Sequence, residues 1–228
     1  MAMGRVLVAG GESPGGLYRI DPSESAGAVT TVASNLGVEP FGITFDGGRV
    51  WTINAGGSVS IVTPGPAVPW AATNISAGFQ VPAGALFDGA SVWVTDFMAG
   101  TLLKLDSFGA ILQTVTVGTN PTFPAFDGAN IWVPNSVSNT VSVVRASTGA
   151  VLATLTGNGQ NAPYYAAFDG ERVLVSDPGG DAVSVWKASS LTAIESISTG
   201  PSTGPFGACS DGLHFWVVLE GSNKLARF

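Results

Sequence analysis

The chain has 228 residues, of which 45% are hydrophobic and only 11% are charged, and its net charge is −7 with nine Lys and Arg residues. Nucleic acids and anionic membranes bind basic surfaces, so this charge argues against both as partners. No apolar run approaches the ~18 residues of a membrane-spanning helix. A single cysteine excludes an internal disulfide, and the 31 Gly and 14 Pro residues favour short strands joined by turns.

The first strands are expected close to the N-terminus. The opening MAMGRVLVAGG lacks a charged segment followed by a long apolar one, so no secretory signal peptide is predicted there. Three strand-like runs follow at residues 4–10, 16–22 and 28–35. The Gly-rich stretch 9–16 precedes a strand, whereas a phosphate cradle needs a helix N-terminus, so this stretch is predicted to be a hairpin loop.

From residue 38 onward one pattern repeats. Asp-Gly pairs recur at Asp46, Asp88, Asp127, Asp169 and Asp211, at intervals of 42, 39, 42 and 42 residues. Each Asp has a Pro six residues before it and is followed by a β-branched or aromatic run, a turn and a second apolar run. The Asp-Gly pair supplies the positive φ of a tight hairpin turn. These aspartates are therefore predicted to be turn residues.

Each repeat has the pattern of a four-stranded antiparallel meander. One meander cannot bury both its faces, so its neighbours must stack on it, and a period of ~40–45 residues with four strands is typical of a propeller blade. The sequence therefore predicts an all-β fold, a single β-propeller domain over residues 1–228. Six blades of four-stranded antiparallel sheet are expected, and five blades are the alternative. The predicted units are about 1–37, 38–80, 81–119, 120–161, 162–203 and 204–228.

The first and last units contain only three strands each. Their unpaired edges allow either a monomer or an assembly through the terminal blades. Within the units, a tryptophan column is predicted to pack blade against blade, and its members are Trp51, Trp93, Trp132 and Trp216, with Leu174 in the fifth place. Cys209 lies in an apolar run and is expected to be a small core residue. His214, the sole histidine, excludes a two-His metal site and is placed on the surface beside a turn.

A polar column closes the second strand of each repeat. Its members are Asn54, Asp96, Asn135, Asp177 and, one place later, Glu220. In propellers such positions lie near one mouth of the central channel, where converging oxygens suit Ca²⁺ or Mg²⁺. The alternative is that each side chain caps its own loop through hydrogen bonds to the backbone. The Gly, Ser or Pro that follows the column favours capping.

A second candidate site is aromatic. Phe41, Tyr164, Tyr165 and Phe206 open the innermost strands, beside Thr122 and Phe123, and Trp70 stands out of register in the irregular loop 64–80. These rings form a candidate ligand surface that would stack a sugar or a planar ligand. The alternative is that they plug the channel.

The repeat PFGITFDGGRVWTIN (40–54) and the last unit PFGACSDGLHFWVVLEG (205–221) resemble YVTN/NHL-like propellers, and especially the streptogramin (virginiamycin B) lyase type. The resemblance implies a metal ion and a general-base His beside a Glu, which together open a cyclic depsipeptide by elimination. In that family His residues follow the Pro that begins a unit. In this chain those positions hold Phe41, Ala83, Thr122, Tyr164 and Phe206, and Glu220 matches the family's Glu. The resemblance therefore implies the fold and argues against the chemistry.

We therefore expect a non-catalytic binding module that presents loops, notably residues 64–80 and 157–163, to a protein or glycan partner. No cofactor is expected beyond the candidate Ca²⁺ or Mg²⁺ ion. The composition resembles that of extracellular or viral surface proteins. One alternative is a metal-assisted lyase or hydrolase using Asp96, Asp177 and Glu220, with Tyr164 as acid or base. A second alternative is a designed or reconstructed propeller scaffold without a ligand.

Overall fold

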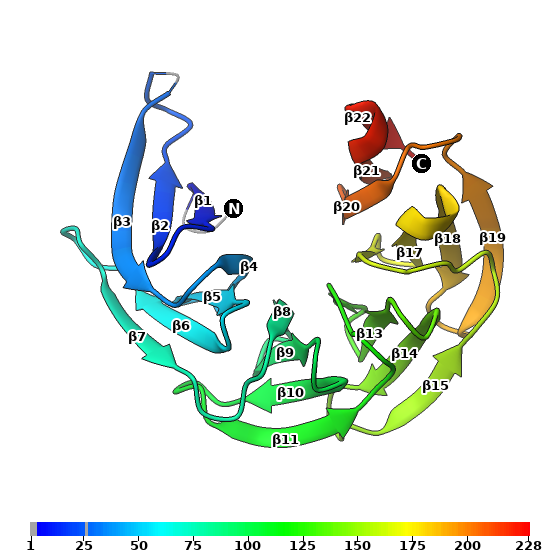
Figure 1. The fold of residues 1–228 in the computed structure, drawn as a ribbon, viewed down its shortest axis with the longest axis horizontal. Coiled ribbons are helices and arrows are strands. Elements are labelled where there is room, and N and C mark those ends of the chain that lie inside the picture. The colour runs from blue at the N-terminus through cyan, green and yellow to red at the C-terminus, as the bar shows by residue number, and fades with distance from the viewer. Residues whose placement is uncertain (1–3, 26) are drawn as a thin grey trace. The chain divides into compact units, whose positions relative to one another are not determined.

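The structure is a computed structural model that describes residues 4–25 and 27–228. Residues 1–3, which begin the N-terminal segment discussed above for a signal peptide, lie outside this range. The described residues form 22 strands in six antiparallel sheets and two short 3-10 helices (Figure 1). The all-β prediction is confirmed. In the part of the chain that is described, no helix is both long and apolar enough to cross a membrane.

The chain divides into two compact units, and unit 1 runs to Ala99 and includes Leu103–Thr114. Its first sheet contains β1 (Val6–Gly10), β2 (Gly15–Ile20) and β3 (Val29–Leu36). Its second contains β4 (Pro40–Phe45), β5 (Val50–Asn54), β6 (Ser58–Thr63) and β7 (Ala71–Ile75). Its third contains β8 (Pro82–Phe87), β9 (Val92–Asp96), β10 (Thr101–Leu105) and β11 (Ile111–Thr116), of which Gly100–Leu102 and the end of β11 are grouped with unit 2. The loop 9–16 is a hairpin between β1 and β2, as predicted.

Unit 2 holds the remaining three sheets. The first contains β12 (Ala125–Phe126), β13 (Asn130–Asn135), β14 (Thr140–Arg145) and β15 (Val151–Leu155). The second contains β16 (Ala166–Phe168), β17 (Arg172–Asp177), β18 (Ala182–Lys187) and β19 (Thr192–Ser198), with the helix η1 (Pro178–Gly180) after β17. The last contains β20 (Pro205–Ser210), β21 (Phe215–Leu219) and β22 (Lys224–Arg227), with η2 (Glu220–Ser222) after β21.

Within each unit, neighbouring sheets pack through their apolar faces, and residues of the tryptophan column lie in these cores. Trp51, Trp93, Trp132 and Leu174 are fully buried. Trp51 of β5 packs against Val94 of β9 and Leu105 of β10, so adjacent sheets share one core. In unit 2, Trp132 packs in the same way with residues of β14, β17 and β18. The prediction that this column packs sheet against sheet is confirmed for Trp51, Trp132 and Leu174, whereas Trp216 is only half-buried.

The repeated aspartates do more than shape turns. In Asp88, Oδ1 accepts the backbone N–H groups of Ala90 (2.8 Å) and Ser91 (2.7 Å), which fixes the hairpin, and Oδ2 accepts the indole N–H of Trp93 (2.7 Å). The same indole bond joins Trp51 to Asp46, Trp132 to Asp127 and Trp216 to Asp211. Where Leu174 replaces the Trp, the guanidinium of Arg172 occupies Oδ2 of Asp169 instead. In four of the five repeats one carboxylate therefore ties the turn to the tryptophan of the following strand.

Three expectations are corrected by the structure. The loop 64–80 contains a regular outer strand, β7. Trp70 is only 7% exposed and packs on Leu17 and Val62 in the core of unit 1, while its indole N–H donates to the Gly65 carbonyl (3.1 Å). Most of its ring is therefore covered by the core, and its indole N–H already has an acceptor. Cys209 is exposed, not part of the core.

Candidate functional site

Four members of the polar column, Asn54, Asp96, Asn135 and Asp177, are buried, and the first three hold the segment that enters their own sheet. Asn54 donates to Ser58 Oγ (3.0 Å) and Ser60 Oγ (2.9 Å), and Ser60 Oγ in turn accepts the Gly37 N–H. Asn135 Oδ1 accepts the Gly118 N–H (3.1 Å). Gly37 and Gly118 lie so close to these two amides that an added Cβ would come within 2.4 Å and 2.6 Å of Asn54 and Asn135 atoms. The side chains thus pin the crossover from the preceding sheet.

Asp96 performs the same task with a carboxylate. Its Oδ2 accepts the Gln80 N–H (2.7 Å), and its Oδ1 accepts the N–H groups of Val81 (3.1 Å) and Ala99 (3.3 Å). Three backbone donors compensate the cost of burying the charge, since a buried carboxylate is stable only where it is paired or hydrogen-bonded.

Asp177 occupies the same register position in β17 and differs sharply from Asp96. Its side chain is fully buried, and neither carboxylate oxygen makes a hydrogen bond of normal geometry to another described residue. The loop before β16 points its donors elsewhere, because the Ala162 N–H goes to Asn139 Oδ1 (2.8 Å) and Asn161 Nδ2 goes to the Gly179 carbonyl (2.8 Å). Burial raises the pKa of Asp177 to about 7, and Ser184 and the Asn161 backbone oppose this only in part.

The donor set does not fit the metal ion that the resemblance implies. Asn54, Asp96 and Asn135 use their oxygens on neighbouring groups in their own sheets. Glu220, the fifth member of the column, is exposed at the start of η2. Among the described residues no three His, Cys, Asp or Glu side chains gather as metal ligands would. Ca²⁺ and Mg²⁺ need six or more oxygen ligands, and Zn²⁺ needs about four ligands, usually nitrogen or sulfur. The side chains of the polar column supply neither set.

We therefore expect the melting temperature to change by less than about 1 °C when Ca²⁺, Mg²⁺, Mn²⁺ or Zn²⁺ is added after EDTA treatment, because an ion that does not bind the folded state cannot stabilise it. Differential scanning fluorimetry checks this. A rise of several degrees with one ion, abolished in Asp96→Asn or Asp177→Asn, would contradict it and restore the metal hypothesis.

Three of the five aromatic residues of the second predicted site, Tyr164, Tyr165 and Phe206, lie together within unit 2. Four aromatic side chains from three sheets contact one another there. The rings of Phe123 and Tyr165 stack with centroids 4.0 Å apart and an interplanar angle of 4°, and those of Tyr164 and Phe206 stack at 4.2 Å and 30°. Tyr164 joins the two pairs, since its centroid lies 5.6 Å from that of Phe123 and 6.0 Å from that of Tyr165. We call these four residues the aromatic cluster.

The backbone that carries the aromatic cluster departs from the regular sheet. β12 and β16 are shorter than the corresponding strands β4, β8 and β20, because the residues before them pair between sheets. The N–H of Phe123 donates to the Tyr164 carbonyl (3.1 Å), and the N–H of Ala166 donates to the Phe123 carbonyl (3.0 Å). These bonds form an isolated parallel bridge between Phe123 and Tyr165. The bridge therefore fixes the backbone of Phe123 and Tyr165 and brings their two rings into the stacked arrangement.

Two hydroxyls lock this arrangement, and sequence reasoning did not foresee the role of either. Thr122 Oγ1 donates to the Tyr164 carbonyl (2.7 Å), and Ser176 Oγ donates to the Phe206 carbonyl (2.7 Å). Ser176 also accepts the Tyr165 N–H (3.0 Å). The sequence signal was present in the case of Ser176, because it precedes the polar column by one residue, as Thr95 does before Asp96.

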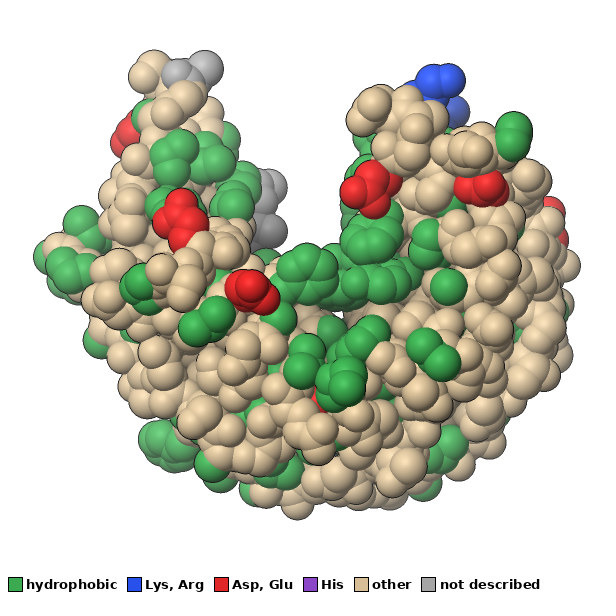
Figure 2. Space-filling model, viewed as in Figure 1, with side chains coloured by type: hydrophobic (Ala, Val, Ile, Leu, Met, Phe, Trp, Pro, Cys, Tyr) green, Lys and Arg blue, Asp and Glu red, His purple; other side chains and the backbone are tan. Residues whose placement is uncertain are grey.

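Charge near the aromatic cluster is negative. Burial raises the pKa of Tyr164, and the charge of Glu220 raises it further. Burial also raises the pKa of Tyr165 to about 12, with Tyr164 adding to the shift. Both phenols therefore stay neutral at physiological pH, which leaves them unsuited to act as a general base. In Figure 2 hydrophobic side chains gather around β20 in unit 2, and acidic side chains adjoin them.

The other predicted aromatic residues lie elsewhere. Phe41 is in β4 of unit 1 and is 54% exposed. Trp70 is in the core, as described above. His214 is on the surface, where its Nδ1 lies 3.7 Å from Asp211 Oδ2, and 42% of its side chain is exposed. The surface placement of His214 is confirmed.

Three solved structures resemble the whole chain. A catalytically inactive virginiamycin B lyase from Staphylococcus aureus with quinupristin has 16% identity and a TM-score of 0.78, over 97% of this chain and 79% of that one. A streptogramin B lyase has 14% identity and a TM-score of 0.79, over 99% and 79%. A selenomethionine-substituted virginiamycin B lyase from S. aureus has 15% identity and a TM-score of 0.75, over 97% and 79%. No family model and no curated protein matches the sequence. The fold is therefore propeller-like and similar to that of the streptogramin B lyases.

Proposed function

We propose that this protein is a non-catalytic propeller that binds a partner on the aromatic cluster. The observation that supports this most directly is that Tyr164, Tyr165 and Phe206 are partly exposed although they are held by backbone bonds and by two buried hydroxyls. The rings of Trp51 and Trp132 in the cores, by contrast, are fully buried. Rigid, partly exposed aromatic side chains are the usual anchors of binding surfaces.

The residues that this chain has in place of the histidines expected from the lyase resemblance support binding over catalysis. The positions that follow the unit-opening prolines hold Thr122, Tyr164 and Phe206 in unit 2, and all three belong to or brace the aromatic cluster. None offers a base near neutral pH, and proton abstraction needs one within hydrogen-bond reach. The lyase or hydrolase alternative has the fold and Glu220 in its favour, but the described residues gather no metal donor set, and the positions that follow the prolines hold no general base.

We also propose that the six sheets are the blades of one six-bladed ring. The sheets at the two ends of the chain support this in part, because each has three strands where the other four sheets have four. Their unpaired edge strands, β1 and β22, would serve either ring closure in a monomer or pairing between molecules.

Binding is tested by applying the protein to oligosaccharide and peptide arrays, with the Tyr164→Ala/Phe206→Ala double variant beside it. We expect at least one class of feature to bind the wild type and to lose about tenfold or more in affinity in the double variant, because each truncated anchor costs about 1 kcal/mol or more. Phe108→Ala is the control, since Phe108 is 79% exposed in unit 1.

Equal binding by wild type and double variant, or no binding feature at all, would contradict the proposal. The catalytic alternative is checked in parallel by incubating the protein with quinupristin and following ring opening by mass spectrometry, where we expect no product.

A further inference from the structure

The chemistry of the aromatic cluster favours one class of ligand, provided that the proposed binding function holds. Aromatic faces carry partial negative charge, which attracts cations placed over them. In the aromatic cluster this attraction comes from neutral rings only, because both tyrosines remain protonated at physiological pH. An adjoining carboxylate would strengthen the attraction, and an adjoining basic side chain would cancel it.

Glu220 supplies the carboxylate. Its backbone is fixed at the start of η2, where its N–H donates to the Gly204 carbonyl (3.1 Å) and its own carbonyl accepts the Asn223 N–H (3.3 Å). Its side chain is exposed, and its charge acts on Tyr164. In the described part of the chain no Lys, Arg or His forms an ion pair with it.

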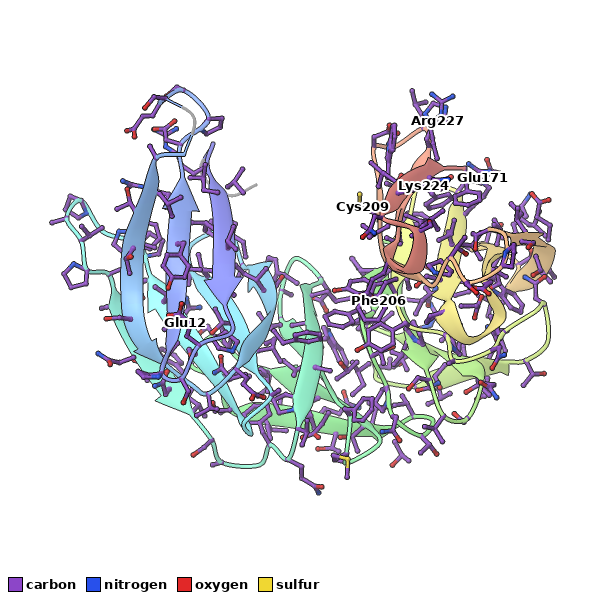
Figure 3. The ribbon with its side chains drawn as sticks, turned by 45° about the horizontal axis from the view of Figure 1, so that its top comes forward. Glu12, Glu171, Phe206, Cys209, Lys224 and Arg227 are labelled. Carbon is purple, nitrogen blue, oxygen red and sulfur yellow. The ribbon has the colours of Figure 1, made fainter. Side chains whose placement is uncertain are left out.

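The basic residues of the same sheet lie apart from the cluster. Lys224 and Arg227 are the two ends of β22, the edge strand of the terminal sheet opposite β20, and Figure 3 shows both of them apart from Phe206. Lys224 pairs with Leu219, the residue before Glu220, and forms no ion pair with Glu220 in the described part of the chain. Elsewhere in unit 2, Arg172 pairs with Asp169 and Lys187 with Glu171. Glu220 is therefore the charge that acts on the aromatic cluster, in a protein whose net charge is −7.

The polar groups around the rings argue against a sugar. Sugar rings need several donors and acceptors at their edge, in addition to a stacking face. The hydroxyls beside the cluster are engaged on the backbone, Thr122 on the Tyr164 carbonyl and Ser176 on the Phe206 carbonyl. What is left for a ligand is aromatic surface, two phenol groups and one carboxylate, a set that matches an alkylated ammonium group.

We propose that Tyr164, Tyr165, Phe206 and Glu220 form a binding site for a small organic cation with a quaternary or alkylated ammonium group. The cation lies against the partly exposed rings, and the Glu220 carboxylate neutralises its charge. An ammonium group carrying methyl groups is weakly hydrated and has apolar surface to bury, so it gains from the rings as well as from the charge.

The three tyrosines of the chain allow a direct test with an internal control. Protein labelled with carbon-13 in its tyrosine rings is titrated with choline at constant ionic strength, and the signals of Tyr164 and Tyr165 are followed by NMR. Tyr18, which donates to Glu12 in unit 1, reports non-specific effects. We expect saturable shifts at Tyr164 and Tyr165, and none at Tyr18.

The neutral isostere 3,3-dimethyl-1-butanol separates charge from shape, and we expect it to bind at least about tenfold more weakly than choline. Glu220→Gln should weaken choline binding about fivefold and leave the isostere unchanged. Glu171→Gln removes an exposed carboxylate elsewhere in unit 2 and should change neither affinity.

Equal affinity for choline and its isostere would overturn the cation proposal and leave the aromatic cluster as an apolar binding surface. Absence of saturable shifts with either compound would also overturn it, while the array experiment decides the proposed function separately. Loss of choline binding in Glu171→Gln as well as Glu220→Gln would show that net charge alone acts and would contradict a built site.

Discussion

Raising the pH from 5 to 9 is expected to destabilise this protein, and Asp177→Asn is expected to abolish most of that loss. The folded pKa of Asp177 is raised to about 7 from the ordinary value of 3.8, because the carboxyl group is buried without hydrogen bonds of normal geometry. Between those two values the folded state holds a proton that the unfolded state has released. Stability therefore falls as pH rises through this window and becomes level above pH 7, by a total of about 4 kcal/mol.

Urea unfolding of the wild type and of Asp177→Asn at five pH values between 5 and 9 measures the effect. The Asn side chain fits this position, because Asn54 and Asn135 occupy the same register position in other sheets. The variant should gain on the wild type by about 3 kcal/mol between pH 5 and pH 9, since the amide has no charge to desolvate.

Asp96→Asn is the matched control. Asp96 has the same position but accepts three backbone N–H groups, so its charge is already compensated. This variant should lose stability across the whole pH range, because an amide oxygen accepts more weakly than a carboxylate and the amide nitrogen faces donors. Parallel pH profiles for wild type and Asp177→Asn would show that the carboxyl of Asp177 is solvated or paired, and its burial would then not be the source of the pH dependence.

The contrast between Asp96 and Asp177 also marks the limit of what sequence predicts. The Asp-Gly pairs predicted a strand-like run after each pair, and β5, β9 and β21 are strands at those runs. Hairpin turns and alternating apolar residues are local sequence signals. They predict the strands well here because each repeat packs against neighbours of the same geometry. The loops between sheets follow no such rule.

Whether a buried side chain beside a loop is hydrogen-bonded depends on where the backbone N–H groups of that loop point. Nothing in the run VLVSD distinguishes Asp177 from Asp96 in VWVTD, because the difference lies in the Ala162 N–H, which goes to Asn139. Likewise, Trp70 looked like a surface aromatic since it broke the repeat, yet it fills the core between two sheets of unit 1. The stacking of Phe123 on Tyr165 depends on a bridge between residues 42 apart, which no local pattern encodes.

Replacing a repeated aspartate by alanine should lower the free energy of unfolding more than replacing an aspartate that only caps a turn. Asp88→Ala tests this most directly. Burial raises the pKa of Asp88, but hydrogen bonds from the Trp93 indole and the N–H groups of Ser91 and Ala90 outweigh it and hold the pKa below its usual range. The variant leaves two turn N–H groups and the indole N–H of the fully buried Trp93 without their acceptor. We expect a loss of about 3–5 kcal/mol in the free energy of unfolding at pH 7.

The same sheet offers a control that separates the turn from the core. Asp106 caps the N–H groups of Phe108 and Ala110 through one oxygen, as Asp88 does for its own turn, but it holds no indole. Asp106→Ala should therefore cost only about 1 kcal/mol, and Trp93→Phe, which removes the indole bond and keeps an aromatic ring, should fall between the two. Because the carboxylate form of Asp88 is the one stabilised, the penalty of Asp88→Ala should shrink as pH falls below 4. Equal losses for Asp88→Ala and Asp106→Ala would mean that the repeated aspartate only shapes its turn, and the tie between each hairpin and the tryptophan beneath it would carry no energy.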